Sequence, residues 1–282
     1  MRELNIGEIK KCSLEVLCKV RDVCETHNIS YSLTGGTLIG AIRHKGFIPW
    51  DDDIYIMIPR PDYDRFVEIV KNGDYGFDLF SAETCGESYG YPFAKAGHRD
   101  TVIKENDTRG EGLLFGVYVD IFPVDGIGNS KILSKLRFMT FQFLHGLKIT
   151  SNWTRFRRAK LRKWYYEPLR FVCYVSSRII GRRKIDRLLD QFVRKRKYED
   201  SKYAGRLVGD YGSKEMMPRS LFEAKIKVEF EGEIFDAISD YDTFLTRLYG
   251  DYMTPPPVEK QVTHHEFVAY WREKDKVTIN PS

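Results

Sequence analysis

Apolar and polar positions change period several times along this chain, and the changes predict a mixed α/β fold. Residues 6–27 place apolar side chains at steps close to three and four, which predicts an amphipathic helix. Residues 31–34 predict a short strand that runs into a double glycine, and residues 37–43 predict a short helix. A second strand is predicted over residues 48–58, before Pro59 and Pro61 interrupt it.

Further strands and helices are predicted after residue 61, so the expected order is a mixed α/β sheet followed by a helical half. Residues 115–122 are mostly apolar and carry one acid, Asp120, near the end of the predicted strand. The remaining predicted elements are a helix over 62–71, strands over 77–80 and 91–95, helices across 131–198, a hairpin over 225–235, a helix over 241–248, and an aromatic helix containing Phe267, Tyr270 and Trp271.

Composition limits the class of protein. The chain has 282 residues, and 42% are apolar, which is enough to bury a core. The longest apolar stretches are far too short to cross a bilayer, and the N-terminus lacks the apolar segment of a signal peptide. Five cysteines without a Cys-x-x-Cys pair argue against a disulfide framework or a zinc site, and they indicate a reducing cytoplasm.

Charge is concentrated in one segment. Residues 155–197 contain sixteen Lys or Arg against three acids, whereas the whole chain carries a net charge of only +5. Basic residues beside Trp164, Tyr165 and Tyr166 favour an anionic membrane surface as the partner, and a solvated helix face is the plain alternative. No recognised nucleic-acid motif accompanies the segment, so no nucleic-acid partner is expected.

Three acids are candidate metal ligands and catalytic residues. Side chains two apart on a strand share a face, so Asp51 and Asp53 of the predicted strand could hold one cation between them. Asp120, from a neighbouring strand, could complete the site. Carboxylates are ligands for Mg²⁺ or Mn²⁺, and a solvated acidic turn is the alternative.

A glycine turn and several basic side chains are candidate phosphate ligands. Glycine lets backbone N–H groups approach an anion closely, and a helix N-terminus attracts negative charge. The plain alternatives are a tight turn for the glycines, an exposed position for the basic residues and a structural role for the histidine. The candidates are Gly35, Gly36, Thr37, Arg43, Lys95 and one of the adjacent pair His264–His265, for which His265 is chosen.

The run of residues 35–53, from Gly35-Gly36 to Asp53, resembles the LicD family, which includes the fukutin-related proteins, within the nucleotidyltransferase superfamily. Residues 91–95, 119–126 and 248–253 and the pair His264–His265 extend the resemblance over nearly the whole chain. The resemblance implies a nucleotidyltransferase-like mixed sheet flanked by helices. The expected parts are a catalytic core over 1–130, a basic helical region over 131–200 and a mixed C-terminal part over 201–282.

The resemblance also implies an activity, namely metal-dependent transfer of phosphocholine from CDP-choline to a sugar hydroxyl of a cell-surface glycan. The acceptor is expected to be lipid-linked or polymeric: lipopolysaccharide, teichoic acid or capsule. By this resemblance, Asp51, Asp53 and Asp120 bind the metal, and the protein is expected to be cytoplasmic and peripheral at the inner face of the membrane.

Tyr55 departs from the family pattern Asp-Asp-Asp-Ile-Asp, in which its position is an acid. His98 is a second departure, because an Asp is expected there. These departures leave open a protein that binds a glycan or nucleotide without catalysis. Transfer of glycerol phosphate, ribitol phosphate or a nucleotide is a further alternative.

Overall fold

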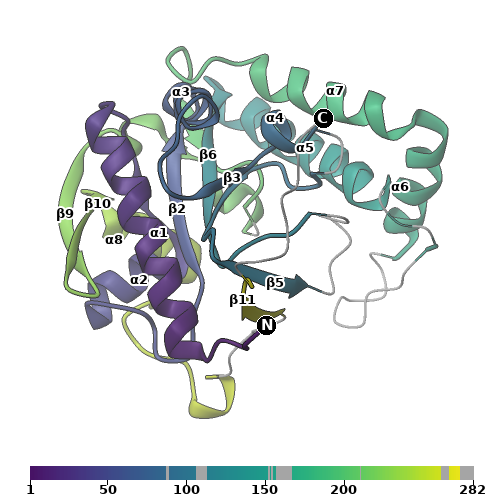
Figure 1. Cartoon of the computed structure of the whole chain (residues 1–282). Helices are drawn as coiled ribbons and strands as arrows, with labels where there is room; N and C mark the ends of the chain where they lie inside the picture. The colour runs from purple at the N-terminus through teal and green to yellow at the C-terminus, as the bar shows by residue number, and fades with distance from the viewer. Residues whose placement is uncertain are drawn as a thin grey trace.

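A seven-stranded mixed sheet forms the centre of the computed structural model, which describes residues 1–86, 89–105, 113–151, 153, 155–156, 167–209, 211–261 and 267–273 (Figure 1). The strands, in spatial order, are β1 (Ser32–Leu33), β2 (Ile54–Pro59), β6 (Tyr118–Gly128), β4 (Ala94–Gly97) and β3 (Asp78–Phe80), with β7 (Tyr203–Gly205) pairing with β6 and β8 (Met217–Pro218) pairing with β7. Strands β2 and β6 are parallel, and the other pairs are antiparallel.

Two further strand pairs lie outside the central sheet. They are the hairpin of β9 (Lys225–Phe230) with β10 (Glu233–Ile238), and β5 (Thr101–Glu105) with β11 (Phe267–Trp271). The turn of the hairpin contains Gly232 at a φ of 78°, a left-handed conformation that suits glycine.

The helices surround the sheet on its two sides. They are α1 (Ile6–Thr26), α2 (Gly35–His44), α3 (Arg60–Lys71), α4 (Ala82–Cys85), α5 (Lys131–Ser151), α6 (Glu167–Ile180), α7 (Arg182–Arg194) and α8 (Tyr241–Tyr249), with short 3₁₀ turns η4 (Gly212–Glu215), η5 (Arg219–Phe222) and η6 (Val258–Lys260). Figure 1 shows α1 alongside the strands and α5, α6 and α7 grouped on the other side of the molecule. None of the described helices is long and apolar enough to cross a membrane.

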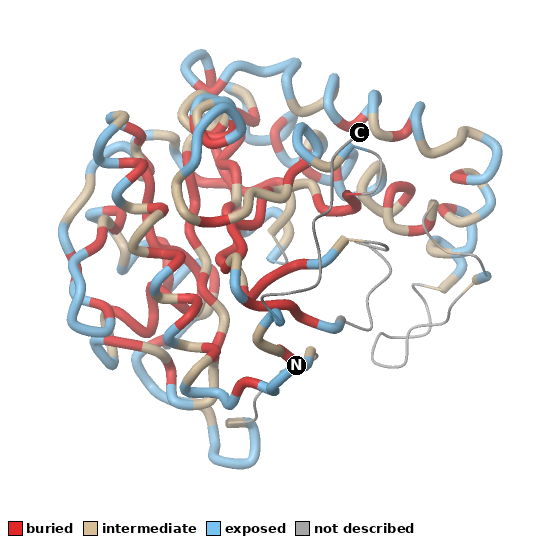
Figure 2. Tube along the Cα trace, in the orientation of Figure 1, coloured by how far each residue is buried: buried red, intermediate tan, exposed pale blue. Residues whose placement is uncertain are grey.

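Alternation along the strands separates an apolar face from a polar one. Ile54, Ile56 and Ile58 of β2 are buried with apolar side chains of α1 and α3 in the main core, whereas Tyr55 points to the opposite face. A separate apolar cluster joins β6 to α5, α7 and residues 203–216. Buried residues accordingly follow the strands and the inward sides of the helices (Figure 2).

The mixed α/β fold and most of the predicted elements are confirmed, but four boundaries or types were wrong. Residues 48–53 are not a strand, because Pro49 and the turn bond from Asp51 N–H to the Ile48 carbonyl delay β2 until Ile54. Asp120 lies near the start of β6, and residues 91–93 precede β4. The predicted C-terminal helix is strand β11, because its backbone pairs with β5.

A buried ion pair joins the residue after β7 to η4, and we expect its loss to be costly. Arg206 donates two bonds to Glu215, at 3.0 and 2.9 Å, and neither side chain is more than 8% exposed. Arg206→Met should lower the free energy of unfolding by about 3 to 5 kcal/mol, because it leaves a buried carboxylate without its partner. Urea denaturation would measure this loss.

The matched control is Arg219→Met, which breaks the more exposed pair of Arg219 with Glu223. That substitution should cost less than about 1 kcal/mol. Equal losses for the two variants would contradict the structural role given to Arg206.

Candidate functional site

A row of polar side chains crosses the face of the sheet opposite α1 and α3. Tyr55 on β2 pairs in register with Asp120 on β6, and Asp120 pairs in register with Lys95 on β4. Neighbours in register point to the same face of a sheet, so the three side chains lie next to one another. The Lys95 ammonium donates to Asp120 Oδ1 at 2.7 Å.

Aromatic rings enclose the Lys95 ammonium. Its Nζ lies 3.4, 4.6 and 5.4 Å from the ring centres of Tyr118, Tyr91 and Phe93 respectively. The side chain is only 2% exposed, so the rings and the Asp120 carboxylate replace the water that a lysine normally keeps. The sequence analysis named Lys95 but missed these rings. Their spacing at positions 91, 93 and 95 was the available signal.

The Tyr55 phenol lies among the three predicted metal ligands. Its hydroxyl donates to Asp53 Oδ2 at 2.7 Å, and the charges of Asp53, Asp120 and Asp51 act on it. Burial, followed by these negative charges, raises the pKa of Tyr55 far above its usual value. The phenol is therefore neutral at physiological pH and serves as a hydrogen-bond donor to the acids.

The acidic turn leads directly into β2 and is tightly packed. Asp51 Oδ1 accepts a bond from the Asp53 N–H at 3.4 Å. Burial, and secondarily the charge of Asp53, raises the pKa of Asp51 to about 6. A Cβ on Gly36 would lie 2.5 Å from Asp51 Oδ2, so the glycine is what lets this carboxylate approach the start of α2.

The predicted glycine turn is the first turn of α2 and is tied to β2. Gly35 has a φ of 59°, and a Cβ there would be 3.4 Å from the Tyr55 ring. The Thr37 hydroxyl accepts a bond from the Tyr55 N–H at 2.8 Å and donates one to the Asp53 carbonyl at 3.5 Å. Thr37 thus positions the start of β2 while the N-terminus of α2 faces the acids.

Arg43 is the one described candidate that lies apart from the acids. It is at the far end of α2, eight residues or about 12 Å from Gly35 along the helix axis. Its guanidinium donates to the Tyr252 carbonyl at 2.7 Å and to His44 at 2.8 Å. His265 lies outside the described residues. His98, which differs from the family pattern, has its Nε2 atom 3.2 Å from Glu15 Oε2 on α1 and does not contact the acids of the row.

The oxygen donors of the site are of the kind that a divalent cation takes. Asp53 accepts a hydrogen bond from Tyr55, and Asp120 accepts one from Lys95. Within the described ranges, no three acidic, histidine or cysteine side chains are arranged so that they could hold one metal ion. Burial, and secondarily the charge of Asp53, raises the pKa of Asp51, and a cation beside this carboxylate would favour its ionised form. The acids therefore fit Mg²⁺ or Mn²⁺ in chemical type.

A cavity of about 360 Å³ adjoins the polar row. It shares Tyr91 and Phe93 with the aromatic enclosure of Lys95. Sequence analysis did not find it, because its other walls come from α3, α4, α5 and α7, which are far apart in the chain.

Comparison with known proteins places the chain in a family. A family model described as "LicD/FKTN/FKRP, nucleotidyltransferase domain" matches residues 28–177. The lipopolysaccharide cholinephosphotransferase LicD of Haemophilus influenzae is 34% identical over 278 residues, which cover 96% of this chain and 99% of that protein. Uncharacterized proteins of Rickettsia typhi and Rickettsia prowazekii are 39% and 40% identical over 71 residues, 25% of this chain and 23% and 27% of theirs. The site residues Gly35–Asp53, Tyr55, Lys95 and Asp120 all lie within the matched domain, and the chain belongs to the LicD/FKTN/FKRP nucleotidyltransferase family.

Proposed function

We propose that this protein transfers phosphocholine from CDP-choline to a sugar hydroxyl of lipopolysaccharide or a related surface glycan. The observation that carries the proposal is that the charges of Asp51, Asp53 and Asp120 all act on the Tyr55 phenol, beside the N-terminus of α2. The nearly full-length similarity to a lipopolysaccharide cholinephosphotransferase supports the choice of phosphocholine and of the acceptor.

In the proposed reaction, the glycan hydroxyl oxygen attacks the β-phosphorus of CDP-choline, and the bond from this phosphorus to the bridging oxygen breaks, so that CMP leaves. The backbone N–H groups at the start of α2 and the Lys95 ammonium orient the phosphates. A carboxylate of the turn, Asp51 or Asp52, takes the proton of the hydroxyl. A Mg²⁺ or Mn²⁺ ion held by Asp51, Asp53 and Asp120 would neutralise phosphate charge.

Tyr55 is compatible with this role. Its phenol donates a hydrogen bond to one oxygen of Asp53, so the tyrosine supports that carboxylate without adding a further negative charge. Binding without catalysis, transfer of glycerol or ribitol phosphate, and nucleotidyl transfer are the competing functions. The leaving group separates nucleotidyl transfer from alcohol-phosphate transfer, the donor that is consumed separates choline from glycerol or ribitol phosphate, and a protein that only binds releases nothing.

The direct test measures metal-dependent release of CMP from CDP-choline in the presence of a lipopolysaccharide acceptor. We expect the natural chain to turn over and Asp53→Asn to lose at least about a hundredfold in rate, the order found when one charge-stabilising group is removed. Asp74→Asn is the matched control, because Asp74 is an exposed acid remote from the row and its loss should leave the rate unchanged.

Tyr55→Asp restores the acid of the family pattern and completes this test. Activity in Tyr55→Asp alone would identify the natural chain as a protein that binds without catalysis. Choline phosphate as the leaving group, in place of CMP, would exclude the proposed transfer.

Asp51→Asn should stabilise the protein at pH 8 while it lowers activity. The pKa of Asp51 is about 6 in the folded protein against an ordinary 3.8, so ionising this group opposes folding above pH 6. The stabilisation should shrink as the pH falls from 6 towards 4, where Asp51 becomes protonated in the folded state. Thermal unfolding in EDTA at several pH values would show a gain in Tm that depends on pH. A gain of the same size at pH 4 and pH 8 would contradict the explanation that burial and the charge of Asp53 disfavour ionised Asp51 in the folded protein.

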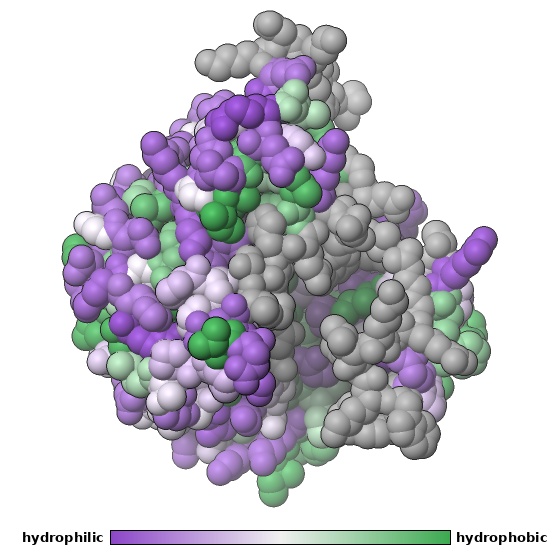
Figure 3. Space-filling view, turned by 90° about the horizontal axis from the view of Figure 1, so that it is seen from below, coloured by the Kyte–Doolittle hydropathy of each residue, from purple (hydrophilic) through white to green (hydrophobic). Residues whose placement is uncertain are grey.

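We further propose that α5 and α6 dock on an anionic membrane, where a lipid-linked acceptor would be found. Ile132, Leu136, Met139 and Phe143 repeat at steps of four and three along α5 and are 41 to 74% exposed. They lie opposite the buried face of the helix, so α5 is apolar on two sides. Figure 3 shows apolar residues along the right-hand edge of the molecule, the side on which α6 lies in Figure 1.

Charge complementarity supports this membrane docking. Val172, Val175 and Ile179 form a similar exposed stripe on α6, and exposed Lys184 and Arg187 follow on α7. Of the 19 large apolar side chains that are exposed in the described ranges, 11 belong to these three helices. Apolar side chains bordered by Lys and Arg are typical of helices that lie in the interface of an anionic bilayer.

Replacing three members of the stripe tests the membrane proposal. The triple variant Ile132→Ser, Met139→Ser and Ile179→Ser should lose at least tenfold in binding to phosphatidylglycerol-containing vesicles, measured by flotation, because it removes buried apolar area at the interface. The control triple Ile234→Ser, Met253→Ser and Val258→Ser changes equally exposed residues elsewhere and should bind normally. Equal binding by both triples would exclude docking through these helices, and a change in oligomeric state of the first triple would point to a second copy as the partner.

A further inference from the structure

The residues that line the cavity beside the polar row have no role in the reaction proposed above. We name it the α4–α7 cavity, because Ala82, Glu83 and Gly86 line one side and residues 186–194 line the other. Five aromatic side chains contribute to its walls: Tyr63, Tyr89, Tyr91, Phe93 and Phe141. Aromatic walls of this kind suit an apolar group or an organic cation.

The inner end of the α4–α7 cavity reaches the catalytic face. Phe93 lies with its ring centre 4.5 Å from that of Phe122, and Phe122 follows Asp120 by two residues on the same face of β6. Tyr91 and Phe93 also enclose Lys95, and they already stabilise a cation there. A donor whose phosphates lie at the polar row would therefore have its alcohol end close to these two rings.

The charges around the α4–α7 cavity favour a cationic occupant. Four lining carboxylates face three lining cations, and each cation is bonded to an acid. Arg60 donates to Asp125 at 2.7 Å, and Lys148 is paired with Asp186. The excess is therefore negative, and the aromatic faces add to the attraction of a positive group.

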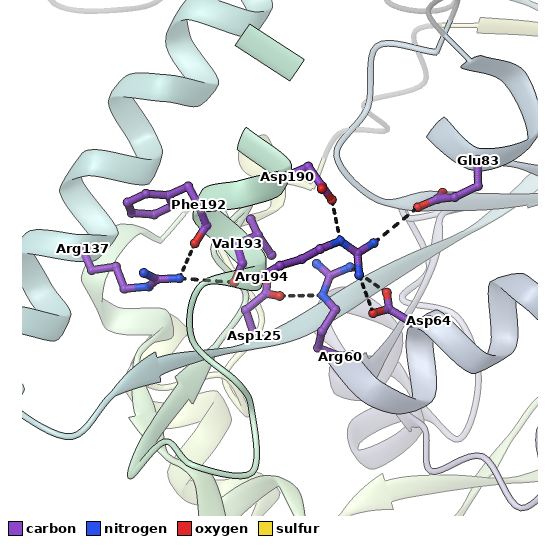
Figure 4. Close-up of polar contacts among 9 residues, drawn as sticks. All are labelled: Arg60, Asp64, Glu83, Asp125, Arg137, Asp190, Phe192, Val193 and Arg194. Carbon is purple, nitrogen blue, oxygen red and sulfur yellow. Dashed lines mark hydrogen bonds and ion pairs between the residues drawn. The ribbon is translucent and has the colours of Figure 1, made fainter. Parts of the chain in front are cut away.

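An exposed arginine lies at the rim of the α4–α7 cavity. Arg194 reaches from α7 to Asp190, Asp64 on α3 and Glu83 on α4, at 2.6, 2.9 and 4.0 Å (Figure 4). Its side chain is 47% exposed, and ion pairs with that exposure contribute little. Arg60 and Asp125 lie deeper, where Arg60 is 19% exposed and Asp125 only 3%.

We propose that the α4–α7 cavity binds the quaternary ammonium group of the donor and thereby selects choline over alcohols with a primary amine or no charge. This inference rests on the proposed function, since it names the part of the molecule that recognises the transferred alcohol. A quaternary ammonium has no N–H to donate, so a binding site made of aromatic faces and nearby carboxylates recognises it, whereas hydrogen-bond acceptors alone would not.

The test fills the α4–α7 cavity without changing the polar row. Val193 lines the cavity from α7, and Val193→Trp should weaken CDP-choline binding about tenfold while CMP binding stays within twofold, as measured by calorimetry. Val258→Trp is the matched control, because Val258 is 79% exposed and distant in the fold. Phe141→Leu keeps most of the apolar volume but removes one ring, and it should weaken CDP-choline binding three- to tenfold.

Comparison of CDP-choline with CDP-ethanolamine tests whether the cavity recognises a quaternary ammonium group. The natural chain should bind CDP-choline at least tenfold more tightly than CDP-ethanolamine, and Val193→Trp should remove this preference. Equal binding of the two donors, absence of CDP-choline binding, or equal affinities of the Val193→Trp and Val258→Trp variants would overturn the inference. Loss of CMP binding in Val193→Trp would also overturn it. Choline selectivity without CMP release would support the cavity assignment and reject the proposed transfer instead.

Discussion

The crowding of three carboxylates at one end of the sheet is the constraint on which this site depends. Asp51, Asp53 and Asp120 lie close enough for their charges to act together on the Tyr55 phenol. The fold relieves the repulsion with two donors: the hydroxyl of Tyr55 and the ammonium of Lys95. Each donor binds a carboxylate oxygen of the kind that a cation would take, so a cation at these oxygens would compete with the two hydrogen bonds.

The residues that sequence analysis could identify are those that lie close together in the chain. Gly35, Gly36, Thr37, Asp51 and Asp53 meet because one turn of α2 packs against the start of β2. Lys95 and Asp120 were also found, since a lone acid or lysine in an apolar strand is conspicuous. The strand alternation used to pair Asp51 with Asp53 was wrong, because both acids lie in a turn, yet the carboxylates are near each other for a different reason: Asp51 accepts the Asp53 N–H.

What sequence analysis could not supply are contacts between distant elements. Local pattern does not reveal that Arg43, eight residues after Gly35, is drawn away to the Tyr252 carbonyl. The local pattern of strand β11 predicts an aromatic helix, because its pairing partners on β5 lie more than 160 residues away in the chain and leave no local signal. The cavity between α4 and α7 is of the same kind, since separate segments between Arg60 and Val208 build its walls.

The aromatic residues of segment 89–93 connect the polar row to the α4–α7 cavity. Tyr91 and Phe93 enclose the Lys95 ammonium beside the polar row, and they also line the α4–α7 cavity. A segment that already compensates one buried cation needs little further change to accept a second one next to it. The same rings would then serve the phosphate-binding lysine and the ammonium of the alcohol, which would couple the position of the donor's two ends through a single short segment of chain.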